Sequence, residues 1–251
     1  MQNGKSQLID KMFSKHFKAK SWAEYNKAFF DGLAKKYDAT NKFTSFGTKW
    51  ILDRKAIAKF QLPQNAKILD LCTGTCDIAI ALAKKYPDSQ ITALDASQPM
   101  LDVGIKKLRK AKINNVITIV GDALSLPFPD DFFDLVIISF GLRNLEDVES
   151  GLLEMRRVAK SCGLVVNIEY GKPSNFFLKL LYRIYFENIA PAVGKVLFHI
   201  GEFNSFRYLP KSNKYFPNQL QLCSIMQKIG FKKIKNHNYF LGVIGQQVCQ
   251  K

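Results

Sequence analysis

Short apolar runs alternate with helical patterns through the middle of the chain. The apolar runs predict strands at residues 67–72, 90–96, 116–120, 133–140 and 164–170. Residues 133–140, Phe-Asp-Leu-Val-Ile-Ile-Ser-Phe, are apolar on both faces, which is typical of a central strand in a parallel sheet. Helical patterns separate these runs at residues 76–86, about 97–110 and 148–160. Strands and helices that alternate at this spacing predict βαβ units around a parallel sheet.

The carboxyl-terminal part of the chain has a different pattern. Residues 217–229 are predicted to be helical, and residues 232–240 and 243–249 are expected to pair as an antiparallel hairpin at the sheet edge. The complete prediction is an α/β fold with a mostly parallel seven-stranded sheet and helices on both faces. Residues 1–251 are expected to form one domain, because this length suits a single α/β core.

Two further segments lie outside the predicted sheet. Residues 22–60 are expected to form helices that precede the first strand. Residues 171–216 form an insert that is rich in Phe and Tyr. We interpret this insert either as a cap over the active edge of the sheet or as additional helices with ordinary packing, and the pattern alone does not choose between them.

The chain is strongly basic, with 37 Lys and Arg against 21 Asp and Glu and a formal net charge of +16. The lysines are scattered as short pairs, such as Lys84-Lys85 and Lys106-Lys107, and form no basic run of five or more. We interpret the charge first as a Lys-rich solvated surface and second as attraction to an anionic membrane surface. Binding to nucleic acid is the third interpretation, and we expect no nucleic-acid partner.

Cysteine usage and the amino terminus indicate the compartment. The five cysteines are an odd number without the spacing of a disulfide framework, which favours free thiols in a reducing cytosol. Residues 1–20 are polar and basic and contain no apolar segment typical of a secretory signal. No run reaches the roughly 18 apolar residues of a membrane span. The predicted location is cytoplasmic. A further expectation is peripheral contact with the inner face of the membrane.

Acidic residues follow three successive strands of the predicted sheet. The first strand leads into residues 70–77, Asp-Leu-Cys-Thr-Gly-Thr-Cys-Asp, while Asp95 ends the second strand and Asp122 follows the third. Ligands of open α/β sheets bind outside the carboxyl ends of the strands, and an acid after the second strand can hold a ribose. Together these residues predict a site for an adenine nucleoside.

The loop after the first strand separates the two common adenine cofactors of this outline. A dinucleotide needs the spacing G-x-G-x-x-G to hold its pyrophosphate, and Gly74 is the loop's single glycine. Asp70 and Asp77 add negative charge where a diphosphate would lie. S-adenosylmethionine (SAM) has no phosphate and carries a sulfonium and an amino group, which acidic residues stabilise. The loop therefore favours SAM over NAD.

At these residues the sequence resembles the class I SAM-dependent methyltransferases, whose fold is Rossmann-like. More specifically, it resembles the ubiquinone/menaquinone biosynthesis C-methyltransferases (UbiE/MenG type, which includes the demethylmenaquinone methyltransferases). The resemblance runs from about residue 29 to near the end. It is most specific at residues 138–144, Ile-Ser-Phe-Gly-Leu-Arg-Asn, and at the set Tyr37, Asp38, Asn41 and residues 45–47. The other resembling stretches are residues 30–50, 121–133, 168–174 and 206–217.

The resemblance implies a role for each matching position on the cofactor side. Thr75 is expected beside the methionine end of SAM, and Asp95 is expected to hold the ribose. Asp122 and Ala123 are expected to flank the adenine, and Ser139 to lie near the sulfonium. The complete expected cofactor-binding set is Asp70, Gly74, Thr75, Asp95, Ala96, Asp122, Ala123 and Ser139. Cys76 departs from the family, which usually has glycine there, and adds a β-carbon beside the methionine pocket.

The reaction implied by the resemblance is methyl transfer from SAM to a ring carbon of a reduced benzoquinol or naphthoquinol with a polyprenyl tail. The ring carbon becomes nucleophilic when a neighbouring hydroxyl loses its proton, so a base or an acceptor is useful. The expected catalytic residues are Tyr37, Asp38, Arg143 and Asn144, and Arg143 would stabilise a phenolate. The reaction needs no metal. The resemblance also implies a homodimer.

Structural interpretations of the same residues stay open. Arg143 would otherwise form an ion pair with Glu146 or Asp147, Asp38 would cap a helix end, and Asp70 would serve its own loop. Three other functions also remain. The first is an RNA or DNA methyltransferase. It is disfavoured because methyltransferases that act on the amino group of a base carry an Asn/Asp-Pro-Pro-aromatic motif after the fourth strand, where this chain has Ser-Phe-Gly-Leu at residues 139–142. The others are a methyltransferase of another small molecule and a non-catalytic partner in a quinone-synthesis complex.

Overall fold

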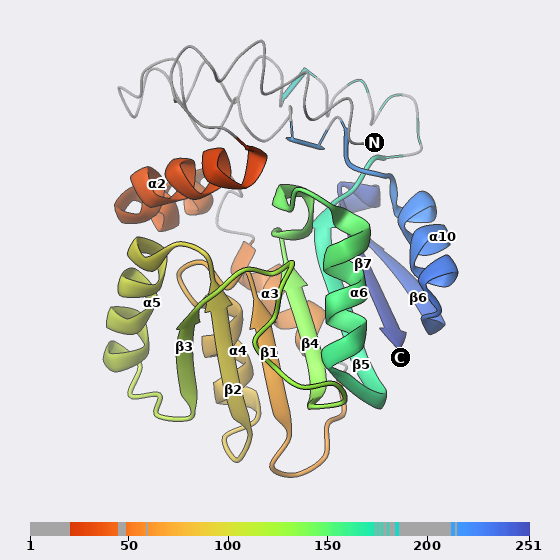
Figure 1. The fold of residues 1–251 in the computed structure, drawn as a ribbon. Coiled ribbons are helices and arrows are strands. Elements are labelled where there is room, and N and C mark those ends of the chain that lie inside the picture. Colours follow the sequence, from red (N-terminus) through yellow and green to blue (C-terminus); the bar gives the residue numbers. More distant parts are fainter. Residues whose placement is uncertain are drawn as a thin grey trace.

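The chain folds around one twisted sheet, with helices packed on both of its faces (Figure 1). A computed structural model describes residues 21–44, 49–58, 60–173, 175, 177, 180, 184–185, 212–213 and 215–251. The strands are β1 (Lys67–Leu71), β2 (Gln90–Asp95), β3 (Val116–Val120), β4 (Phe133–Ser139), β5 (Ala159–Tyr170), β6 (Lys232–Tyr239) and β7 (Ile244–Gln250). The helices are α2 (Trp22–Thr44), α3 (Lys49–Ala58), α4 (Asp77–Lys85), α5 (Gln98–Lys110), α6 (Val148–Val158) and α10 (Gln219–Ile229), with short 3₁₀ turns η1 (Leu142–Asn144) and η3 (Phe240–Gly242).

The sheet has the order β3-β2-β1-β4-β5-β7-β6. Strands β1 to β5 are parallel, and β7 is antiparallel to both β5 and β6. The predicted seven-stranded, mostly parallel sheet with a hairpin at its edge is therefore confirmed. The chain leaves β1 toward β2 and β3, whereas it leaves β4 toward β5. Such a reversal of strand order opens a crevice at the carboxyl ends of the two central strands.

Local signals place most helix ends correctly. The Ser97 hydroxyl accepts a hydrogen bond from the Met100 backbone N–H at the start of α5, as predicted for an N-cap. Helix α10 begins two residues later than predicted, because Asn218 and Gln221 form a reciprocal capping box. It ends at Gly230, whose φ of 98° requires glycine.

The boundary between α6 and β5 was predicted wrongly. Helix α6 ends at Val158 rather than at residue 160, and β5 begins at Ala159 rather than at residue 164. Ala159 pairs with Phe133, after which the register shifts before Leu164 pairs with Leu135. The intervening residues form a bulge in which Cys162 has a φ of 64°. Gly163 lies in this bulge, where a β-carbon would come within 2.8 Å of the Lys160 carbonyl oxygen.

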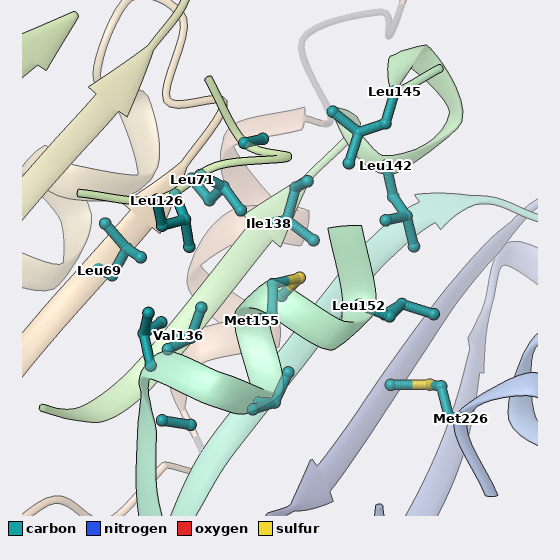
Figure 2. Close-up of a cluster of buried hydrophobic side chains, with 14 of the residues drawn as sticks. Leu69, Leu71, Leu126, Val136, Ile138, Leu142, Leu145, Leu152, Met155 and Met226 are labelled. Atoms are coloured by element: carbon teal, nitrogen blue, oxygen red, sulfur yellow. The ribbon is translucent and has the colours of Figure 1, made fainter. Parts of the chain in front are cut away.

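Two apolar layers hold the sheet between its helices. In β4, Val136 and Ile138 face the layer that contains α6 and α10, whereas Leu135 and Ile137 face the layer that contains α3 and α4. All four side chains are fully buried, as predicted for a central strand. In the first layer Leu152 and Met155 of α6 lie over Val136 and Ile138, and Met226 of α10 approaches from the side (Figure 2).

Residues 22–60 are helical in their described part, as predicted, and α2 lies across the carboxyl ends of the strands (Figure 1). Most of the aromatic insert at 171–216 lies outside the described residues, so its role as a cap stays a prediction. Of its described part, Phe216 is buried in the layer below α6 and α10, and Phe177 is exposed. Within the described part of the chain, every helix is too short or too polar to span a bilayer.

Adjacent leucines of α6 provide a matched test of this packing. Leu152 is fully buried and Leu153 is 50% exposed. We expect Leu152→Ala to lower the free energy of unfolding by about 2–5 kcal/mol, because it leaves a cavity in the core. Leu153→Ala should change it by about 0.5 kcal/mol or less. Denaturant unfolding of both variants measures the difference, and equal losses would contradict the described orientation of α6.

Candidate active site

A cavity opens at the carboxyl ends of the central strands, beneath α2. This main cavity is lined by residues of α2 and of the loops after β1, β2, β3 and β4. Eight of the predicted site residues line it: Tyr37, Gly74, Asp95, Ala96, Asp122, Ala123, Ser139 and Asn144. A small cavity adjoins it and shares Tyr37, Cys72, Ser139 and Phe140, while adding Asp70 and Thr75. Asp38 and Arg143 line neither of these two cavities.

Asp95 connects two loops of the cavity wall. Its carboxylate accepts hydrogen bonds from the backbone N–H of Gly74, at 2.8 Å, and of Ser97, at 2.9 Å. Burial raises the pKa of the Asp95 carboxyl, and the backbone donors oppose this shift because they favour the charged form. The acid at the end of β2 thus fixes the glycine loop after β1 while it lines the main cavity.

The loop after β1 is tightly wound. Asp70 is buried and accepts a hydrogen bond from the Thr73 hydroxyl at 2.5 Å, so its carboxylate does serve its own loop, and it also lines the small cavity. Gly74 has a φ of 58°, which favours glycine. Cys72, also with positive φ, lines both cavities, and burial raises the pKa of its thiol well above the ordinary value.

Cys76 is accommodated without lining either cavity. The residue is fully buried in the left-handed region, with φ 64° and ψ 26°, directly before α4. Its Sγ lies against Gly104 of α5, where a β-carbon on Gly104 would come within 2.4 Å. The absent side chain at Gly104 therefore provides the space that the thiol at position 76 occupies. In the part of the chain that the structure describes, no three His, Cys, Asp or Glu side chains form a group that could hold a metal.

Helix α2 is fastened over the main cavity by side-chain hydrogen bonds. At its start, the Trp22 indole N–H and the Asn26 amide both donate to the backbone carbonyl of Asn144, at 2.9 and 2.8 Å. Farther along, the Asp31 carboxylate accepts a hydrogen bond from the Ser97 hydroxyl. These contacts join α2 to the loops after β4 and β2.

The later part of α2 is held by a charged cluster. Asp38 accepts hydrogen bonds from the Thr75 hydroxyl at 2.6 Å and from Lys107 Nζ at 2.9 Å. Lys107 also pairs with Asp77, and although burial lowers the pKa of Lys107, the two carboxylates outweigh it and hold the pKa above the ordinary value. Asp38 lies within α2, which continues to Thr44, so the expectation that it caps a helix end is wrong.

Arg143 is buried in an ion pair with Glu169, whose carboxylate lies 2.6 Å from Nη1. The sequence also suggested that Arg143 pairs with Glu146 or Asp147, but Arg143 Nη1 pairs with Glu169 instead. Asp147 instead caps α6 and accepts from the backbone N–H of Glu149. Glu169 lies in the stretch 168–174 that carries the resemblance, but neither its pattern nor its spacing revealed this partner 26 positions away.

Ser139 carries the one buried hydroxyl in the described residues that lines both cavities without a hydrogen-bond partner. A buried polar atom without a partner is costly unless a ligand or water satisfies it. The oxygen therefore indicates where a polar ligand lies, at the end of β4 and between the two cavities. Acidic groups (Asp70, Asp95) surround this region and suit a cationic ligand without phosphate.

The resemblance identified Tyr37 and Asp38 of α2, but the sequence analysis missed the contribution of the first half of this helix. Asn26 and Phe30 line the main cavity beside Tyr37, and Trp22 fixes its rim. The two side chains that hold Asn144 are 122 and 118 positions away from it. Helical periodicity identifies α2 as a helix but says nothing about which loops it covers.

The fold and this site define a SAM-dependent methyltransferase. A SAM-dependent methyltransferase from Aquifex aeolicus superimposes with a TM-score of 0.63 at 16% identity, covering 87% of this chain and 97% of that one. The phosphoethanolamine N-methyltransferase 2 of Haemonchus contortus, solved with SAM, gives a TM-score of 0.61 at 18% identity and covers 80% of this chain and 52% of the other. These likenesses confirm the predicted fold class.

The chain belongs to the ubiE/COQ5 methyltransferase family, whose model matches residues 18–251. A ubiquinone/menaquinone biosynthesis C-methyltransferase UbiE from Geotalea daltonii is 36% identical over 229 residues, covering 90% of this chain and 96% of its own length. A demethylmenaquinone methyltransferase from Bacillus subtilis is also 36% identical, over 88% of this chain and 95% of its own. The predicted family, enzyme class and cofactor are thereby confirmed.

The residues present fit SAM. The loop after β1 holds a single glycine and acidic residues, which suits a cationic ligand, and the Ser139 oxygen has no partner among the described residues. Asp95, at the end of β2, is in the position where a ribose is held in such folds.

Replacing Asp95 tests the cofactor side. Asp95→Asn keeps the shape but removes the charge, and we expect SAM to bind about 10- to 100-fold more weakly, since hydrogen bonds to a charged group are worth about 1.5–3 kcal/mol. Asp88→Asn, an exposed acid before β2 at the opposite end of the strand, serves as the control and should leave the affinity unchanged. Calorimetric titration measures both, and unaltered binding by Asp95→Asn would exclude the assigned role.

Proposed function

We propose that this enzyme transfers a methyl group from SAM to a ring carbon of a reduced polyprenyl quinol, either demethylmenaquinol or a polyprenyl methoxybenzoquinol. The observation that carries the proposal is that the main cavity combines acidic and apolar lining. Asp95 ends β2 and Asp122 follows β3, and apolar side chains, including Phe30, Phe140 and Leu145, line the same cavity. The names of the similar proteins from Geotalea daltonii and Bacillus subtilis support the substrate class.

On the cofactor side, we assign Asp95 with Ala96 to the ribose and Asp122 with Ala123 to the adenine. Gly74, Thr75 and Asp70 would hold the methionine end, where the small cavity adjoins the main one. Ser139 would donate its free hydroxyl between the two cavities. When bound, SAM supplies a methyl group already activated by its sulfonium.

On the acceptor side, Tyr37 and Asn144 are the two catalytic candidates that line the main cavity. We propose that the Tyr37 hydroxyl and the Asn144 amide orient the ring hydroxyl of the quinol while Phe30 and Phe140 enclose the ring. Alignment of the reacting atoms alone can supply about 7–11 kcal/mol of barrier lowering, so positioning is the main contribution of the protein.

Asp38 and Arg143 are assigned positioning roles. Asp38 holds Thr75 and Lys107 and thereby fixes α2 on the loop after β1. Arg143 is enclosed by Glu169 and by the Phe140 carbonyl, at 2.6 Å each. Contacts to charged or polar protein groups occupy both side chains, so we propose neither Asp38 as the proton acceptor nor Arg143 as the group that stabilises a phenolate.

The acceptor assignment is tested with Tyr37→Phe. We expect kcat for methylation of a short-tailed demethylmenaquinol to fall about 10- to 100-fold, because orientation of the hydroxyl is lost. SAM affinity should be retained. Tyr86→Phe is the matched control, since the Tyr86 hydroxyl donates to the Phe60 carbonyl away from both cavities.

The product identifies the reaction. Mass spectrometry and NMR of the isolated product should show the methyl group on a ring carbon. Methylation of an oxygen or nitrogen acceptor, with no product from either quinol, would favour the small-molecule alternative, and SAM binding without any turnover would favour a non-catalytic partner.

We also propose that the enzyme is a cytoplasmic protein that docks transiently on anionic membranes, where a polyprenyl quinol resides. The net charge is +16, and Phe240 and Leu241 are 52% and 73% exposed at the turn between β6 and β7. Both residues have positive φ, which presents apolar side chains to solvent at a strained turn. Residues 171–173 lie beside this turn, where a β-carbon on Gly242 would come within 3.5 Å of Pro173 Cα.

Vesicle binding tests the docking proposal. We expect sedimentation with phosphatidylglycerol vesicles, reduced by salt because each basic residue near the lipid contributes about 1 kcal/mol. Leu241→Ser should weaken binding, whereas Leu220→Ser, an equally exposed leucine on α10, should not. Equal binding to neutral phosphatidylcholine vesicles would contradict the electrostatic part. A homodimer is retained as a proposal, which sedimentation equilibrium checks.

A further inference from the structure

A buried ion pair lies beside residues 140–144. Part of this turn lines the main cavity where we place the acceptor ring, and we call it the acceptor wall. The side chains of Arg143 and Glu169 are 7% and 3% exposed, and they meet at 2.6 Å. Arg143 belongs to the turn after β4, and Glu169 to the end of β5, its neighbour in the sheet. Desolvation of two charges offsets most of their attraction, so a buried pair is weak evidence for a stabilising role. Its place beside the site calls for another explanation.

The surroundings of Glu169 match a carboxylate and not an amide. Oε1 accepts hydrogen bonds from Arg143 Nη1 at 2.6 Å and from the Tyr170 backbone N–H at 2.9 Å. Oε2 accepts from the Arg143 backbone N–H at 3.3 Å. Because both oxygens face donors, an amide at this position would turn its own N–H groups against a donor.

Arg143 in turn holds a strained turn. Its Nη1 donates to the Phe140 carbonyl at 2.6 Å, and the Asn144 amide donates to the same carbonyl at 3.3 Å. Phe140 has a φ of 56°, a conformation that side chains other than glycine adopt at a cost. Two donors on one carbonyl therefore maintain a backbone geometry that the residue would not adopt by itself.

This turn lines the main cavity and also holds the start of α2, which lies over it. Phe140, Gly141 and Asn144 line the main cavity directly. The Asn144 carbonyl also receives both Trp22 and Asn26, which fasten the start of α2. A shift of the turn would therefore move the acceptor wall and release α2 together.

We propose that Glu169 is a positioning residue for methyl transfer: its carboxylate holds Arg143, and Arg143 holds the turn of residues 140–144 that carries the acceptor wall. The reaction concerned is the one under "Proposed function", on which this inference rests. Glu169 and Arg143 line neither of the two cavities. They set the distance between the acceptor ring and the cofactor residues Asp95 and Asp122, which lie at the end of β2 and after β3 and not at β4.

Glu169→Gln tests the proposal by separating kinetics from binding. We expect kcat for the quinol to fall about 10- to 100-fold, since small displacements of an acceptor cost rate steeply. The affinity for SAM should stay within about threefold, because Asp95 and Asp122, assigned to the ribose and the adenine, lie at the end of β2 and after β3 rather than after β4. A loss that appears in kcat and not in SAM binding is a result that general destabilisation would not produce.

A second readout needs no quinol. The chain has two tryptophans, and Trp50→Phe leaves Trp22 as the single emitter. Trp22 is 2% exposed, and its indole N–H donates a hydrogen bond to the Asn144 carbonyl. If Glu169→Gln loosens the turn, this indole becomes more exposed to water, so we expect its emission to shift to longer wavelength. If the wild-type enzyme methylates no quinol, the proposed function fails, while this emission still decides whether Glu169 holds the turn.

Two controls exclude a purely structural role. Asp134→Asn removes an acid that pairs with Lys160 near the opposite end of the sheet, and it should lower the melting temperature without changing kcat. The double variant Arg143→Met with Glu169→Leu replaces the pair by apolar groups, which is often neutral for stability. It should fold with a melting temperature near that of the wild type and still show the low kcat. It also decides the question if Glu169→Gln fails to fold.

Three results would overturn the proposal. The first is a folded Glu169→Gln enzyme with kcat within about twofold of the wild type and unchanged Trp22 emission. The second is a fall in kcat in both Asp134→Asn and Glu169→Gln that is in the same proportion to each variant's loss of stability. The third is recovery of kcat in the double variant, which would show that only the unpaired charge was harmful.

Discussion

Parallel pairing of β1 with β4 is the constraint on which the active site depends. The pairing sets Leu71 opposite Ile138, so the loop that begins at Cys72 lies beside Ser139. The chain then continues from these strands in opposite directions, toward β2 on one side and β5 on the other. The two loops therefore depart to opposite sides, and the crevice between them becomes the cavity. The position of the cavity is thus a property of strand order, and the side chains at the strand ends give it its chemistry.

Helix α2 converts this crevice into an enclosed site. Its contacts with the loops after β1, β2 and β4 are hydrogen bonds and ion pairs made by Asp31, Asp38, Trp22 and Asn26. Apolar burial adds to these contacts, because Trp22, Tyr25 and Phe29 of α2 are buried. Since one helix holds all three loops, α2 fixes their positions relative to one another.

Charges are distributed according to their task. Three of the acids that line the cavities, Asp70, Asp95 and Asp122, lie at or just after the ends of three successive strands, and their charge suits a cationic cofactor. The acid at the end of β5, Glu169, is instead satisfied inside the protein by Arg143 and two backbone donors. Carboxylates at the ends of different strands of one sheet thus have different surroundings: Asp95 lines the main cavity, and Glu169 lines neither cavity. Cys76 shows a similar dependence on context, because the missing side chain of Gly104 accommodates it.

The sequence by itself determined the α/β fold, the seven strands, the hairpin at the edge and the Ser97 cap, because short-range periodicity carries that information. It also identified eight of the residues that line the main cavity, through strand-end position and through the family resemblance. The bulge that moves the start of β5 to Ala159 was missed, since pairing with Phe133 creates it. Only the tertiary structure decided that Arg143 pairs with Glu169, that Trp22 reaches Asn144, and that Asp38 holds Thr75. These contacts join residues 26 to 122 positions apart, and such partners are fixed by how the helices and loops pack on the sheet rather than by any local pattern.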